Sequence, residues 1–182
     1  MQRRHFVKQS ALSAAAILSA PLMSKETILG QAGKRYRLDT QWSRADATRY
    51  PVKDCHEMVQ DSKGRILLLT NDTHNNVIIY SKKGKVLKTW GTTYPGAHGL
   101  TLFNENGTDV LFICDNSRHQ VIKTTMDGQE LLVLDYPKES GLYTKAEEYI
   151  PTETTITATC DIYVADGYGK DYIHHYDSKG RY

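Results

Sequence analysis

The chain has 182 residues and a formal net charge of +2, and 40% of its residues are hydrophobic. Charges of both signs alternate along it, which excludes a dedicated polyanion-binding surface, so we expect no nucleic-acid partner. Beyond residue 33 no apolar run is long enough to cross a bilayer, so we expect no stable membrane span. Composition therefore favours a globular chain that acts on a small molecule, a peptide or a protein.

The first 32 residues are typical of an export signal and a linker. Arg3 and Arg4 are followed by Phe6 and Lys8, and then by a short, Ala-rich, weakly apolar run at 10–20. Twin-arginine signals have this order of basic and apolar segments, and the run is too short to anchor the chain stably in a membrane. We therefore predict an N-terminal signal helix and a periplasmic or secreted protein, with a frayed basic helix as the alternative.

A lead-in segment at 33–54 precedes three similar units, which span approximately 55–91, 97–135 and 150–182. In each unit short runs rich in β-branched and aromatic residues alternate with turn-forming Gly, Asn and Asp. This pattern predicts four short antiparallel strands in each unit, with the fourth strand of the third unit expected beyond Tyr182.

The units repeat in register. Gly84 and Gly128 lie 44 residues apart in equivalent turns, and His56 and His98 lie 42 residues apart at equivalent strand starts. The next equivalent glycine, Gly180, comes 52 residues after Gly128, which places an insertion of eight residues (52 minus 44) between them, most plausibly in the loop 135–149. A period of about 40–45 residues with four strands is the signature of propeller blades.

We therefore predict an all-β chain with a partial β-propeller over 55–182. Closed propellers contain at least four blades and usually six to eight. Because the mature chain holds about three blades, we expect it to be a fragment of a longer protein, with closure of the arc by self-association as the alternative.

The units resemble the NHL family of six-bladed propellers over roughly 55–182. Three stretches, 98–102, 118–123 and 163–168, are similar to the lyase domain that completes peptide C-terminal amidation, peptidyl-α-hydroxyglycine α-amidating lyase. The resemblance implies an NHL-type fold and a zinc ion held by three histidines, each at the start of an innermost strand. It also implies a small-molecule or peptide substrate in the central channel, whose C–N bond is cleaved to give an amide and glyoxylate.

Two site residues follow from the resemblance. His98 matches the first zinc histidine, and Tyr168 matches the catalytic tyrosine. Imidazole nitrogens are good zinc ligands, and a tyrosine beside the metal could remove the substrate's hydroxyl proton. The remaining two zinc histidines are expected beyond Tyr182.

Two positions depart from the lyase pattern. The family's arginine is expected near 69–74, where Asn71 or His74 stands instead. Gly169 follows Tyr168 at the place where the lyase has a disulfide-forming cysteine. Both departures concern the surroundings of the predicted zinc and tyrosine.

The repeat adds a second histidine. His56 occupies the position in its unit that His98 holds in the next, and the third unit has Thr152 there. Because innermost strand starts converge on the channel of a propeller, we predict that His56 and His98 lie on neighbouring strands and that His56 is a further metal ligand or a substrate contact. The alternative is that each histidine only satisfies a backbone carbonyl.

Other polar residues have mainly structural interpretations. Asp115 and Asp166 each end a second strand and are predicted to hold the following turn through backbone N–H groups. Metal binding by either carboxylate, such as a structural Ca²⁺, is the alternative. His119 is expected to form a loop or inter-blade hydrogen bond, whereas the adjacent His174 and His175 must point to opposite faces of a strand.

Two functions remain open from the sequence. The first is an exported zinc-dependent lyase of the amidating type, with His98 and His56 as metal ligands and Tyr168 as the catalytic residue. The second is a non-catalytic NHL propeller that binds a protein, peptide or carbohydrate partner.

Overall fold

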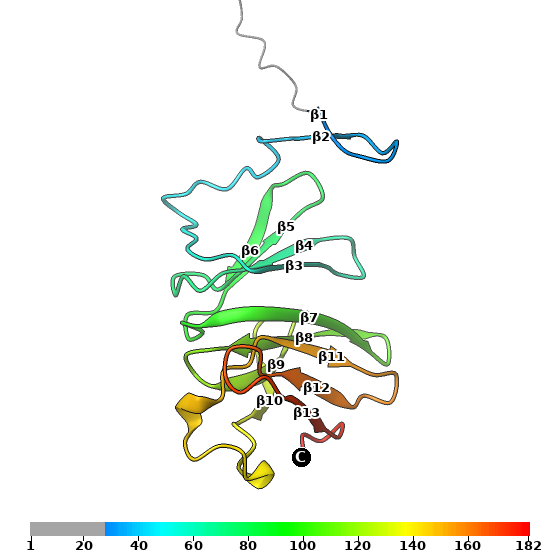
Figure 1. Ribbon diagram of the computed structural model, residues 1–182. Coiled ribbons are helices and arrows are strands. Elements are labelled where there is room, and N and C mark those ends of the chain that lie inside the picture. Colours follow the sequence, from blue (N-terminus) through cyan, green and yellow to red (C-terminus); the bar gives the residue numbers. More distant parts are fainter. Residues whose placement is uncertain (1–27) are drawn as a thin grey trace, which may run out of the picture. The chain divides into compact units, whose positions relative to one another are not determined.

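The structure is a computed structural model that describes residues 28–182, in two units, Met1–Thr40 and Gln41–Tyr182 (Figure 1). In the first unit, β1 (Ile28–Leu29) pairs with β2 (Tyr36–Arg37) in a two-stranded antiparallel sheet. The predicted signal helix falls on residues outside the described ones, so export stays a prediction. None of the helices among residues 28–182 is long and apolar enough to cross a bilayer.

The second unit confirms the all-β propeller prediction, with one antiparallel sheet for each predicted blade (Figure 1). In the first blade the strands pair in chain order. These strands are β3 (Glu57–Gln60), β4 (Ile66–Leu69), β5 (Val77–Tyr80) and β6 (Val86–Trp90). The second blade has the same order. Its strands are β7 (Ala97–Glu105), β8 (Thr108–Asp115), β9 (Gln120–Thr125) and β10 (Glu130–Leu134).

The third blade has three strands among the described residues, as predicted for this part of the chain. They are β11 (Glu153–Ile156), β12 (Ile162–Ala165) and β13 (Ile173–Tyr176), again paired in chain order.

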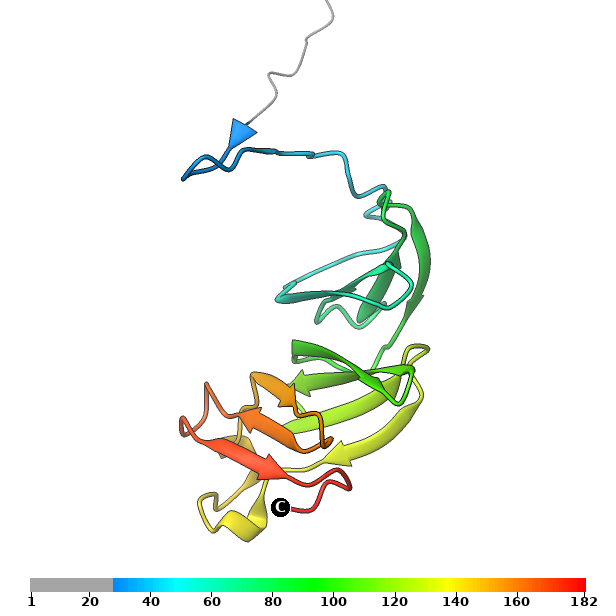
Figure 2. The same cartoon turned by 90° about the vertical axis from the view of Figure 1, so that its right-hand side faces the viewer.

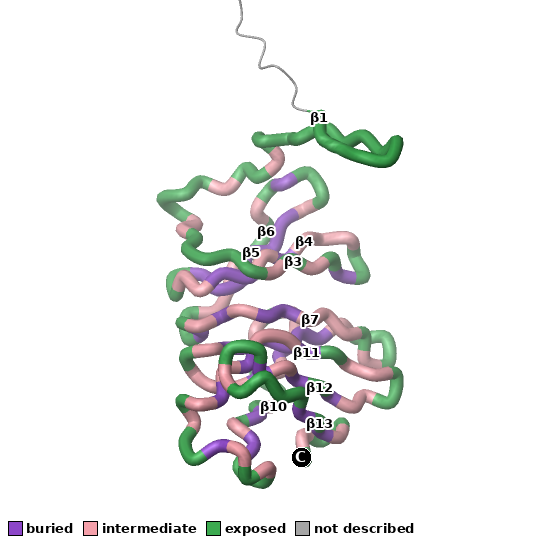
Figure 3. Tube along the Cα trace, viewed as in Figure 1, coloured by how far each residue is buried: buried purple, intermediate pink, exposed green. Residues whose placement is uncertain are grey.

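The predicted insertion between the second and third blades contains no strand. Its residues 136–149, called here the inserted segment, include two short 3₁₀ helices, η1 (Lys138–Ser140) and η2 (Ala146–Glu148). Tyr143 and Tyr149 of this segment are buried and belong to one apolar cluster with residues of the second and third blades. Figure 3 shows buried stretches along the strands of both blades. The insertion is therefore anchored to the blades by aromatic packing.

The turns of the repeat use one backbone geometry. In four of the turns a glycine with positive φ donates its N–H to the carbonyl three residues earlier, at Gly64, Gly84, Gly128 and Gly180. Cys160, at a φ of 66°, does the same in the turn between β11 and β12. A side chain is strained at such φ values, which explains why glycine recurs at this position. The recurring turn fixes the register of each hairpin and so keeps the blades alike.

The blades are held together by apolar side chains between their faces. Strand β8 contributes side chains to two apolar clusters, because successive side chains of a strand point to opposite faces. Leu111 and Ile113 pack with the first blade, whereas Val110, Phe112 and Cys114 pack with the third. The three first strands, β3, β7 and β11, come to lie side by side, with β7 in the middle (Figure 2).

The three cysteines are free thiols. Cys114 is fully buried, where burial raises the pKa of its thiol well above the usual value. Cys55 is exposed and lies two residues before β3.

Leu111→Ala tests the inter-blade core. Because Leu111 is fully buried, we expect the substitution to lower the free energy of unfolding by about 2–5 kcal/mol, measured by urea denaturation. The matched control is Leu131→Ala, at a leucine that is 48% exposed on the same blade, with an expected loss below about 0.5 kcal/mol. Equal losses at both positions would contradict this packing.

Candidate functional site

The structure brings together the three residues that the sequence selected. His56 immediately precedes β3, His98 lies at the start of β7, and Tyr168 lies on the loop between β12 and β13. The rings of His56 and His98, called here the histidine pair, stack with centroids 4.1 Å apart and an interplanar angle of 25°. The prediction that they lie on neighbouring strands is confirmed.

The hydrogen bonds of His98 define its tautomer. Nδ1 lies 3.1 Å from the carbonyl oxygen of Thr152, which can only accept, so Nδ1 carries the hydrogen. In the neutral ring Nε2 then bears a lone pair, and it lies 3.3 Å from the hydroxyl of Tyr168, which donates to it. The rings of His98 and Tyr168 meet edge to face, with centroids 5.1 Å apart. The carbonyl contact predicted as an alternative role for His98 therefore exists, and the lone pair of Nε2 accepts the hydrogen bond from Tyr168.

The site is open to solvent. Tyr168 is 62% exposed, and His56 is also exposed, whereas His98 is half-buried. In the part of the chain that the structure describes, no group of three or more His, Cys, Asp or Glu side chains could hold a metal ion. The histidine pair thus offers at most two metal ligands.

A pair of carboxylates lies on the same first strands, and the sequence reasoning missed it. Glu57 follows His56, and Glu153 follows Thr152, so both occupy the same place in the repeat. Burial and the neighbouring Glu153 raise the pKa of Glu57. The hydroxyl of Thr101, on β7 between them, donates to Oε1 of Glu153 at 2.8 Å. The pair could have been found from its repeated position, because Glu57 is the first residue of β3 and Glu153 is the first residue of β11.

Gly99 explains how β7 fits between its neighbours. A Cβ at this position would lie 2.4 Å from the carbonyl oxygen of Thr152, the same oxygen that accepts from His98. Any larger residue would therefore push β7 away from the start of β11 and break the contact that orients the His98 ring.

The predicted roles of Asp115 and Asp166 are confirmed. Oδ1 of Asp115 accepts hydrogen bonds from the backbone N–H groups of Ser117 and Arg118 at 2.9 and 2.8 Å. Burial raises the pKa of Asp115, and these donors oppose the rise. Asp166 accepts from the N–H of Lys170 at 2.8 Å. Calcium binding stays a prediction.

The other histidines among residues 28–182 lie apart from the pair. Nδ1 of His119 donates to the carbonyl of Tyr149 at 2.8 Å, the expected inter-blade bond. His174 is fully buried and His175 is exposed, as expected for adjacent residues of one strand. His74 is exposed and lies beside Asp72.

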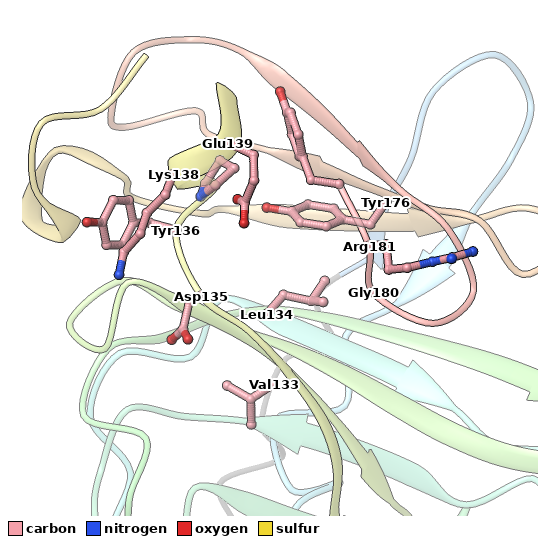
Figure 4. Close-up of a pocket in the computed structure, with 11 residues that line it drawn as sticks. Val133, Leu134, Asp135, Tyr136, Lys138, Glu139, Tyr176, Gly180 and Arg181 are labelled. Carbon is pink, nitrogen blue, oxygen red and sulfur yellow. The ribbon is translucent and has the colours of Figure 1, made fainter. Parts of the chain in front are cut away.

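A separate pocket of about 520 Å³ lies between β10 and the C-terminal turn (Figure 4). Leu134, Tyr176 and Arg181 are among its lining residues, and neither the histidine pair nor Tyr168 is. The pocket borders β13, whose outer edge has no partner strand among the described residues. It is thus distinct from the site that the sequence selected.

No family model and no curated protein sequence matches the chain. A solved structure of a protein of unknown function from Bacteroides caccae matches 70% of the chain at 12% identity and a TM-score of 0.52. A streptogramin B lyase matches 82% of it at 17% identity and a TM-score of 0.49. The virginiamycin B lyase of Staphylococcus aureus matches 69% at 14% identity and a TM-score of 0.47. The chain spans about half the length of these structures, covering 47%, 46% and 42% of them, and the likeness concerns the fold alone.

Tyr168→Phe tests the contact between Tyr168 and His98. Because the substitution removes the donor to Nε2 of His98, we expect the ¹⁵N resonance of that nitrogen to shift while Nδ1 keeps its hydrogen. The control is Tyr172→Phe, at an exposed tyrosine of the same loop, which should leave the resonance unchanged. A hydrogen on Nε2 in the wild-type protein would contradict the assigned tautomer.

Proposed function

We propose that this chain is part of an exported, zinc-dependent lyase of the peptidyl-α-hydroxyglycine amidating type. The observation that carries the proposal is the convergence of His56, His98 and Tyr168, which come from three different blades. The resemblance of 98–102 and 163–168 to that lyase supports the same assignment from the sequence.

The donor set fits zinc in part. His98 presents a lone pair on Nε2 while its Nδ1–H is held by a backbone carbonyl, the arrangement in which most zinc histidines are oriented. His56 adds a second, solvent-exposed imidazole against it. Catalytic zinc sites have three protein ligands and one open position. The proposal therefore takes His98 as one of the three zinc histidines and His56 as a further ligand or substrate contact, and it assigns the two remaining zinc histidines to residues outside 28–182.

The chemistry assigns one step to Tyr168. Zinc, when bound, would polarise a substrate oxygen. In the proposed reaction the hydroxyl of Tyr168 first gives its proton to solvent, and the resulting phenolate oxygen accepts the proton of the substrate's α-hydroxyl group. The C–N bond then breaks as the carbonyl group of glyoxylate forms, and the leaving nitrogen takes up a proton to give the amide. No electrons are gained or lost, so no further reactant is needed.

The position near the family's arginine has another role in this chain. Asn71 donates from Nδ2 to Oδ2 of Asp54 at 2.9 Å and accepts from the N–H of Asp54 at 3.0 Å. It therefore ties the lead-in to the first blade, and the proposal assigns no arginine to substrate binding.

His98→Ala tests the proposed zinc site. In the intact protein we expect the substitution to weaken zinc binding by at least about a hundredfold, because even partners of metal ligands are worth 10- to 100-fold in affinity. Zinc affinity is measured by competition with a chromophoric chelator, and the control is His175→Ala, at an exposed histidine that stacks on Tyr163 instead.

Negligible zinc binding by the wild-type protein, or equal affinity in both variants, would remove the basis of the enzyme proposal. The remaining function would then be the non-catalytic propeller that binds a protein, peptide or carbohydrate.

Export is tested by replacing Arg3 and Arg4 together with lysine. Because twin-arginine signals depend on both guanidinium groups, we expect the precursor to accumulate inside the cell, measured by fractionation and immunoblotting. Lys8→Arg serves as the control and should be exported normally. Undiminished periplasmic material in the double variant would count against this route.

A further inference from the structure

The loop that carries Tyr168 spans residues 166–172, called here the Tyr168 loop. Its ends are closed by a hydrogen bond of 2.9 Å from the N–H of Asp166 to the carbonyl of Tyr172. The N–H of Asp171 donates back to the carbonyl of Asp166 at 3.0 Å, with Asp171 at a φ of 61°. Tyr168 itself is exposed, so its position depends on how this backbone is held.

The base of the loop is the buried carboxylate of Asp166. Its Oδ1 accepts from the N–H of Ile150 at 2.7 Å, and its Oδ2 accepts from the N–H of Lys170 at 2.8 Å. A Cβ at Gly169 would lie 2.1 Å from Oδ1, so the chain passes the carboxylate too closely for any other residue. This explains why glycine follows Tyr168 in this chain.

Tyr143, from the inserted segment, supplies the third donor to this carboxylate. Its hydroxyl lies 2.6 Å from Oδ2 of Asp166 and 2.7 Å from Nε2 of His174. Because an ionised carboxylate only accepts, the phenol hydrogen points to Asp166, and Nε2–H of the buried His174 donates to the phenol oxygen. The hydrogen bonds therefore run in one direction, from His174 through Tyr143 to Asp166.

A second contact ties the inserted segment to the loop. Nζ of Lys170 donates to the carbonyl of Leu142 at 2.8 Å and forms an ion pair with Oε2 of Glu148 at 2.7 Å. The segment thus holds the Tyr168 loop both at its buried base and at its surface.

The second blade shows what the same turn looks like without this contact. Asp115 stands at the position of Asp166 and also holds its turn, but its Oδ2 is buried without a hydrogen-bond partner among the described residues. That turn carries none of the predicted catalytic residues. Of these two blades, only the one whose loop carries Tyr168 therefore has the additional hydrogen bond from Tyr143.

We infer that Tyr143 is a positioning residue for Tyr168 and acts through the carboxylate of Asp166. The catalytic role of Tyr168 rests on the proposed function, whereas the hydrogen bonds that hold the Tyr168 loop do not depend on it. The insertion between the second and third blades accordingly has a role in the site: it fixes where the phenol of Tyr168 stands relative to Nε2 of His98.

The test is Tyr143→Phe in the full chain, which keeps the aromatic ring and removes only the hydroxyl. A hydrogen bond to a charged group is lost, so we expect the amide of Lys170 to exchange its hydrogen about tenfold faster. The ¹⁵N resonance of His98 Nε2 should move toward its value in Tyr168→Phe. The matched control is Tyr136→Phe in the same segment, which should change neither.

Glu148→Gln is a second variant: it removes the charge that pairs with Lys170, and it leaves a single oxygen to accept the two hydrogen bonds from Thr144. We expect a smaller change in the same direction at the Lys170 amide and at His98. This variant keeps the inference testable should Tyr143→Phe prove poorly folded.

Activity provides a separate readout. If the zinc lyase proposal holds, Tyr143→Phe should lower kcat about tenfold while zinc affinity stays within about twofold of wild type. A lower thermal midpoint with unchanged Lys170 exchange and an unchanged His98 resonance would overturn the inference. If both NMR readouts change as expected but the wild-type protein binds no zinc, the proposed function fails and the positioning role of Tyr143 stands.

Discussion

The burial of both faces of the second blade is the constraint on which the site depends. Strand β8 gives alternate side chains to two apolar clusters, Leu111 and Ile113 toward the first blade and Val110, Phe112 and Cys114 toward the third. Each buried side chain of this size contributes about 1.5–3 kcal/mol, so the sheets can stack only face to face. Their first strands then lie side by side, which brings residues from three blades together.

The contacts of His98 depend on this stacking of the blades. The ring lies against His56 of the preceding blade, donates to a carbonyl of the following blade and accepts from Tyr168. Each of these partners is supplied by a different part of the chain. A shift of one blade against the next would therefore alter both the orientation of the imidazole and the hydrogen bond at its Nε2.

The repeat in the sequence was sufficient to predict the blades and the histidine pair. Turn glycines such as Gly84 and Gly128 set the period, and the period aligned His56 with His98 at equivalent strand starts. The roles of Asp115 and Asp166 also followed from their repeated place. Local turn chemistry and the alternation of side chains along strands suffice for such inferences, because they act between residues that are close in sequence or equivalent in the repeat.

Contacts across the insertion could not be predicted in this way. Tyr143 reaches Asp166 over 23 residues through a segment without repeat counterpart, and its path depends on packing against the third blade. The carboxylates of Glu57 and Glu153 were missed because the strand between them has Gly99 at the equivalent position.

The most direct measurement of the central claim is X-ray absorption at the zinc edge of the intact, zinc-loaded protein. The account predicts a first shell with at least two imidazole nitrogens, one of which disappears in His98→Ala. A shell of sulfur or carboxylate ligands without imidazole would contradict it.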